Sequence, residues 1–111
     1  MDIFETAASS FEGHLKKNPY PGRGLVIGRT ESGGNWIILY WIMGRSESSR
    51  NRRFVAEGGA LRTEPIDFSK VKDPSLIIYE AMLELSKTYI VSNGDQTRTI
   101  FEGIQKGLTF P

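Results

Sequence analysis

The chain has 111 residues, a net charge of +1, 39% hydrophobic residues and no cysteine. This composition is typical of one globular domain over residues 1–111, and it excludes a disulfide framework and a thiolate metal site. With His14 as the single histidine and no long apolar run, we expect no metal site, no membrane association and a cytoplasmic location. The near-zero net charge argues against a dedicated nucleic-acid-binding protein.

The first half of the sequence predicts a helix followed by a hairpin. Apolar residues at spacings of three and four predict an amphipathic helix over residues 3–17. The sequence NPYPG at 18–22 breaks the chain, and a β-branched stretch over 23–30 predicts a strand. A glycine-rich loop at 31–35 leads to a return strand over 35–43. Because this strand is apolar at consecutive positions, we expect it to be buried on both faces, in a sheet covered on each side.

A second hairpin is predicted around Gly58 and Gly59, with strands over residues 53–57 and 61–64. A polar connection over residues 65–74 follows it.

Two interpretations stay open for the next stretch. Residues 73–75 could cap a helix that continues through Leu85, or residues 76–79 could form a short strand or turn. Beyond it, residues 87–92 are typical of a strand. Residues 97–106 predict a helix that is C-capped by Gly107.

The loop between the two hairpins is the most distinctive stretch chemically. Residues 40–54 read YWIMGRSESSRNRRF, with four arginines against one glutamate and with serines and an asparagine between them. Guanidinium groups match planar and tetrahedral oxyanions, and hydroxyls and amides add neutral donors. The loop therefore predicts an anion site, most simply for phosphate. The alternative is a solvated basic loop that balances acidic surface elsewhere.

Three segments with glycines adjoin predicted strands, namely residues 20–24, 44–54 and 92–97. Their polar residues could converge at one edge of a sheet, where glycine lets the backbone approach a ligand closely. For residues 92–97 the alternative is a helix N-terminus that Asn93 or Asp95 caps.

Four motifs in this order, YPGRGLVIGRT, YWIMGRSESSRNR, LIIYEAM and IVSNGDQTRTI, resemble the archaeal-type IMP cyclohydrolase family and its bacterial relatives. The resemblance covers residues 18 to about 107 and corresponds to the N-terminal part of the family. It implies an α+β fold, an N-terminal-nucleophile-hydrolase-like α-β-β-α sandwich, of which this chain holds the N-terminal portion. It also implies closure of 5-formamidoimidazole-4-carboxamide ribonucleotide to IMP with loss of water, without a cofactor.

The resemblance further implies site residues. Arg50 and Tyr79 correspond to catalytic residues: Tyr79 would be a proton donor or orienter beside the reacting groups, and Arg50 would bind or polarise the substrate. We expect further substrate-binding residues at Arg23, Arg45, Ser46, Asn51, Asn93, Asp95 and Thr97. Structural alternatives are that Tyr79 is a core aromatic and that Arg23 pairs with Glu31 or another carboxylate. The chain begins Met1-Asp2, so no N-terminal nucleophile is expected.

Family members extend beyond the position of Pro111, into a part that carries a catalytic carboxylate. A non-catalytic purine-nucleotide-binding remnant is therefore an alternative function. A module that stacks RNA on Trp36, Tyr40 and Trp41 is another, but it needs these rings exposed, whereas their apolar setting predicts burial. We expect a small-molecule purine nucleotide as partner, no nucleic acid and no membrane, and association into a homo-oligomer through an unpaired strand edge.

Overall fold

The computed structural model describes residues 2–71, 73 and 78–109 of the chain. In chain order its elements are α1 (Ile3–Ser10), the π-helical η1 (Phe11–Lys16), β1 (Gly24–Arg29), β2 (Trp36–Trp41), α2 (Glu47–Arg50), β3 (Arg53–Glu57), β4 (Ala60–Glu64), the 3₁₀ turn η2 (Phe68–Lys70), β5 (Glu80–Leu85), β6 (Thr88–Val91) and α3 (Gln96–Gln105). Helices and antiparallel strands occur in the same domain, so the α+β class is confirmed.

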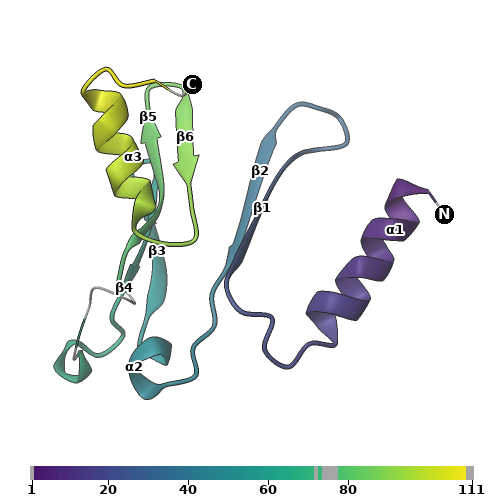
Figure 1. Cartoon of the computed structure of the whole chain (residues 1–111), viewed down its shortest axis with the longest axis horizontal. Helices are drawn as coiled ribbons and strands as arrows, with labels where there is room; N and C mark the ends of the chain where they lie inside the picture. Colours follow the sequence, from purple (N-terminus) through teal and green to yellow (C-terminus); the bar gives the residue numbers. More distant parts are fainter. Residues whose placement is uncertain (1, 72, 74–77, 110–111) are drawn as a thin grey trace.

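The strands form two separate antiparallel sheets. One is the hairpin β1-β2, and the other has four strands in the order β3-β4-β5-β6. Across the view of Figure 1, α3, the four-stranded sheet, the β1-β2 hairpin and the N-terminal helix follow one another. Helix α3 packs on β5 and β6, whereas α1 adjoins its own continuation η1.

The N-terminal helix begins with a capping box. The Asp2 carboxylate accepts from the Glu5 amide at 2.8 Å, and the Glu5 carboxylate accepts from the Asp2 amide at 3.0 Å. The predicted helix is confirmed through Lys16. Its apolar stripe is uncovered, since Ile3 is 78% exposed and Phe4 81% exposed.

The hairpin β1-β2 is confirmed, but the predicted burial of β2 on both faces is wrong. Ile37 is 39% exposed and Leu39 is 56% exposed, whereas Ile38 and Tyr40 are half-buried. Neighbouring side chains of a strand point to opposite faces, so the face of Ile38 and Tyr40 turns inward, although Trp36 at its end is 68% exposed. Within the described residues the hairpin pairs with no third strand, and its face with Ile37 and Leu39 is partly open to water.

The four-stranded sheet decides which of the elements predicted for the second half of the chain are present. The hairpin predicted at Gly58 and Gly59 is confirmed, and both glycines have positive φ, 57° and 79°, as a type I′ turn requires. The predicted strand over residues 87–92 is confirmed as β6. The helix considered through Leu85 is wrong, because Glu80–Leu85 is strand β5; the short strand considered at 76–79 falls partly outside the described residues.

The C-terminal helix is capped by Gly107, as the sequence predicted. Gly107 has φ 87°, its amide donates to the Ile104 carbonyl at 3.0 Å, and the Leu108 amide donates to the Gly103 carbonyl at 3.0 Å. This pair of bonds is a Schellman motif, which satisfies carbonyls left open at a helix end. The helix begins one residue earlier than predicted, at Gln96.

The core is small. Its buried apolar residues are Ala81, Leu83 and Ile90 of β5 and β6, the strands that α3 contacts, and Tyr79, which contacts Tyr40 of the hairpin. The radius of gyration is 16.4 Å, against about 13 Å for a compact domain of this length. Much apolar surface on the hairpin and on the N-terminal helix therefore stays in contact with water. No helix among the described residues is long and apolar enough to cross a membrane.

Thr97 fastens α3 to the sheet. Its side chain is fully buried, and its hydroxyl bonds to the Ser92 hydroxyl at 2.6 Å and to the Ala81 carbonyl at 3.2 Å.

We expect Thr97→Val to lower the free energy of unfolding by about 1–3 kcal/mol, because buried polar groups lose their partner. Thr99→Val, on the exposed face of the same helix, is the matched control. Urea denaturation followed by circular dichroism measures both, and an equal effect of the two substitutions would contradict this account.

Candidate functional site

Two tyrosines join the hairpin to the four-stranded sheet. The hydroxyl of Tyr40, from β2, lies 2.8 Å from that of Tyr79, which immediately precedes β5. The Tyr40 hydroxyl also donates to the Ser92 carbonyl at 2.8 Å, next to the end of β6. The edge of the Tyr40 ring meets the Phe54 ring at 5.7 Å between centroids. Three segments distant in sequence thus meet at one pair of hydroxyls.

The backbone of Tyr79 is held from both sides by Thr63 of β4. The Thr63 amide donates to the Tyr79 carbonyl at 3.0 Å, and the Tyr79 amide donates to the Thr63 hydroxyl at 2.9 Å. Tyr79 is 7% exposed and Thr63 is 2% exposed, so water competes little for these bonds. The position of the Tyr79 ring is therefore fixed by the fold.

Arg23 adds two further contacts at the junction between Tyr40 and Tyr79. Its guanidinium carbon lies 4.6 Å from the centre of the Tyr79 ring, and Nη1 donates to the Asn93 carbonyl. Arg45 similarly covers the Tyr20 ring at 4.2 Å. These contacts confirm that segments 20–24, 44–54 and 92–97 converge.

Arg52 adds a buried positive charge to the same junction. It is 8% exposed, and Nη2 donates to the Met43 carbonyl at 3.0 Å. Burial lowers the pKa of Arg52, and the nearby positive charge of Arg23 lowers it further. Two cations held within electrostatic reach of each other repel, so a bound anion between or beside them would relieve that repulsion.

Three arginines of the converging segments bond to carbonyls and aromatic rings and not to acids among the described residues, as does Arg29 of the hairpin, which donates to the Gly33 carbonyl and lies over the Trp36 ring. Within the described residues, Arg23, Arg45 and Arg50 form no ion pair with a carboxylate. The guanidinium of Arg50 instead donates from Nε to the Gly44 carbonyl at 2.8 Å. Arg50 and Arg52 also line the same hollow of about 210 Å³. Guanidiniums that bond only to carbonyls and rings retain their full positive charge for a ligand.

By contrast, the arginines of the four-stranded sheet and of α3 are matched with acids. Arg53 and Arg62 pair with Glu64 at 2.6 Å and 3.0 Å, and Arg98 pairs with Glu80.

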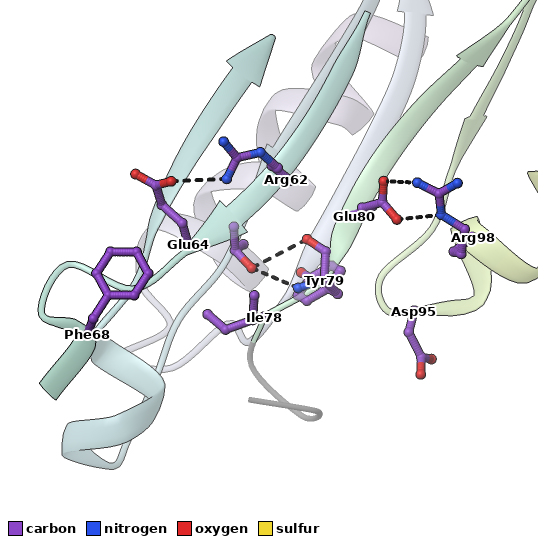
Figure 2. A pocket seen from close by; sticks show the side chains of 9 residues that line it. Arg62, Glu64, Phe68, Ile78, Tyr79, Glu80, Asp95 and Arg98 are labelled. Carbon is purple, nitrogen blue, oxygen red and sulfur yellow. Dashed lines mark hydrogen bonds and ion pairs between the residues drawn. The ribbon is translucent and has the colours of Figure 1, made fainter. Parts of the chain in front are cut away.

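Figure 2 shows a larger hollow of about 470 Å³, on whose walls two of these pairs lie. Arg62 faces Glu64, and Arg98 faces Glu80 through two hydrogen bonds. Because each guanidinium is already neutralised, these two pairs leave little charge for an anion. Tyr79 and the exposed Asp95 line the hollow too.

Several predicted binding residues make hydrogen bonds within the protein. The Ser46 hydroxyl accepts from the Ser49 amide at 3.0 Å and begins α2 as its N-cap. The Asn51 side chain exchanges two hydrogen bonds with the backbone of Asp67, at 2.7 Å and 2.8 Å. Thr97 is buried against the sheet, and Asn93 takes part through its carbonyl. The bonds of Ser46 and Asn51 hold the loop over residues 44–54 in one conformation, so it is not a freely solvated loop.

Three residues of the converging segments were not among the predicted site residues, namely Tyr20, Tyr40 and Arg52. Tyr40 was assigned to a uniformly buried strand, although its place two residues after Ile38 puts both on one face. Arg52 lies beside Arg53 at the start of β3, where neighbouring side chains diverge. Arg53 therefore reaches out to Glu64 while Arg52 turns inward.

In the described part of the chain, no group of three or more histidine or acidic side chains is placed to hold a metal ion.

A family model described as "IMP cyclohydrolase-like protein" matches residues 20–111. The chain belongs to this family. It is 33% identical over 85 residues to an IMP cyclohydrolase from Methanothrix thermoacetophila, an alignment that covers 75% of this chain and 43% of that protein. The chain thus spans less than half the length of the curated relative that it matches. No solved structure matches it. The resemblance drawn from the four motifs is confirmed.

The environment of Tyr40 predicts a pH effect on stability. Burial, and then the hydrogen bond with Tyr79, raise the pKa of Tyr40 above its ordinary value of about 10. A raised pKa means that the folded state favours the protonated phenol, so this stabilisation is present below pH about 10 and is lost above it. We expect Tyr40→Phe to lessen the fall in free energy of unfolding between about pH 9.5 and 11.

Denaturation at a series of pH values measures this effect. Tyr89→Phe, which alters a tyrosine that is 54% exposed, serves as the control and should keep the wild-type pH dependence. If Tyr40→Phe also kept that dependence, the account of the junction would be wrong.

Proposed function

We propose that this chain binds 5-formamidoimidazole-4-carboxamide ribonucleotide and closes it to IMP with loss of water. The observation that carries the proposal is that Arg23, Arg45 and Arg50 have no carboxylate partner among the described residues, while Arg23 lies over the Tyr79 ring of the Tyr40–Tyr79 pair. Membership of the IMP cyclohydrolase-like family supports this assignment.

The 5′-phosphate of the substrate is a dianion, and it requires positive charge. Arg45 stacks its flat face on the Tyr20 ring, which leaves the N–H groups at its edge available for oxygen. Arg50 is exposed and lies in the same loop, with its Nε fixed on the Gly44 carbonyl. A phosphate held by these two guanidiniums gains charge-assisted hydrogen bonds.

Ring closure itself needs donors and a proton path. The carboxamide nitrogen attacks the formyl carbon, and negative charge develops on the formyl oxygen, where preorganised donors lower the barrier. Arg23 and Arg52 supply fixed positive charge beside Tyr79. The carboxamide nitrogen and the formamide nitrogen each lose one proton, and both protons leave with the formyl oxygen as water. No step of this reaction requires a cofactor.

We also propose that the chain folds as part of an N-terminal-nucleophile-hydrolase-like α-β-β-α sandwich. The succession of α3, sheet, hairpin and N-terminal helix in Figure 1 supports this arrangement.

We further propose that the chain forms a homo-oligomer, which the exposed apolar side chains of β2 support. We expect the protein to be located in the cytoplasm.

A second candidate is a purine-nucleotide-binding protein without catalysis. It is favoured by Arg23, Arg45 and Arg50, whose guanidiniums bond to carbonyls and rings, because binding an anion needs no acid or base. Binding of IMP without turnover of the formamido nucleotide would identify it. An RNA-binding role has less support, because Tyr40 is engaged with Tyr79 and Phe54 rather than open for stacking.

The proposed activity predicts a difference between two neighbouring arginines. Arg50→Ala should lower kcat/KM for ring closure by roughly 10–100-fold, the loss of a charge-assisted hydrogen bond. Arg53→Ala should leave it within about 2-fold, because Arg53 is exposed and pairs with Glu64. Absorbance-monitored formation of IMP measures both. A wild-type chain without turnover, or equal losses in the two variants, would refute the assignment.

A further inference from the structure

The direction of hydrogen bonding between Tyr40 and Tyr79 follows from counting protons. Each phenol carries one proton, and a main-chain carbonyl can only accept. Tyr40 donates its proton to the Ser92 carbonyl at 2.8 Å. The 2.8 Å bond between the two hydroxyls therefore has Tyr79 as donor. The order of donation runs from Tyr79 to Tyr40 to Ser92.

This direction determines what Tyr79 offers to a ligand. Its proton points at the Tyr40 oxygen, so the remaining capacity of the Tyr79 oxygen is to accept. Arg23 lies over the face of the Tyr79 ring and gives its Nη1 proton to the Asn93 carbonyl. A group that arrives at the Tyr79 hydroxyl thus meets a lone pair.

We propose that Tyr40 is a positioning residue, which keeps the Tyr79 proton turned away from the substrate and presents Tyr79 as an acceptor for the attacking carboxamide N–H. The inference rests on the proposed cyclisation and narrows the role of Tyr79 from donor or orienter to orienter. An N–H held by an acceptor is aligned for attack, and its nitrogen becomes more electron-rich.

The surroundings keep Tyr40 in this role. Its ring is braced at the edge by Phe54 at 5.7 Å, and its carbonyl partner Ser92 lies beside β6. Burial raises the pKa of Tyr40, so its hydroxyl keeps the proton that it donates at neutral pH. Tyr79 is fixed through its backbone by Thr63. A pair already in place needs no reorganisation when the substrate arrives.

Nuclear magnetic resonance of the full chain tests the direction without substrate. We expect two tyrosine hydroxyl protons protected from exchange, one from Tyr40 and one from Tyr79. In Tyr79→Phe the Tyr40 proton should persist, because it bonds to Ser92. In Tyr40→Phe the Tyr79 proton should lose its protection. A Tyr40 proton that vanishes in Tyr79→Phe, or the absence of both protons from the wild-type chain, would overturn the inference.

Turnover tests the consequence for the substrate. Tyr40→Phe should lower kcat roughly 10-fold with little change in KM, the effect of one hydrogen bond made in the transition state. Because Tyr40 acts through Tyr79, the double variant should be no slower than Tyr79→Phe alone. Multiplying losses would overturn the positioning role. Tyr89→Phe, at an exposed site, is the control and should keep wild-type rates.

The two tests separate the two claims. A wild-type chain without turnover would refute the cyclisation, and with it the role toward the substrate, while the hydroxyl protons would still report the direction of bonding. Turnover with the opposite direction of bonding would refute the inference and leave the cyclisation intact.

Discussion

The junction of Tyr40, Tyr79 and Arg23 is the contact on which the rest of the structure depends. In the part of the chain that the structure describes, the hairpin and the four-stranded sheet share no backbone pairing, so side chains set their relative placement. A chain of hydroxyls from Tyr79 through Tyr40 reaches the Ser92 carbonyl, and Arg23 spans from the Tyr79 ring to the Asn93 carbonyl. A buried polar network costs free energy when some of its groups lack a hydrogen-bond partner. When every group is paired, the network favours a single arrangement of the surrounding elements. Arg23, which has no carboxylate partner among the described residues, is one of the contacts that join the two sheets.

Turn chemistry and helix ends were predictable from the sequence, because they depend on local conformation. Gly58 and Gly59 adopt the positive φ values of their turn, and Gly107 ends α3 through a Schellman motif. The arginine loop was also visible as a candidate anion site. Its local charge does not depend on tertiary contacts.

What the sequence could not predict depends on packing between distant segments. The apolar run of β2 suggested cover on both faces, but no third strand among the described residues joins the hairpin, and Leu39 stays 56% exposed. Asn51 and Thr97 looked like ligand-binding groups, yet their polar atoms hold Asp67 and Ala81. Whether a polar side chain faces a ligand or the backbone is decided by its neighbours in space, and local sequence does not carry that information.

The central claim is that the junction is a site for a nucleotide with a 5′-phosphate, and calorimetric titration with IMP and with inosine tests it most directly. The two ligands share base and ribose and differ in the phosphate. The account predicts that IMP binds, that its affinity falls as salt rises, and that inosine binds far more weakly. Equal affinity for the two ligands, or no binding of IMP, would contradict it.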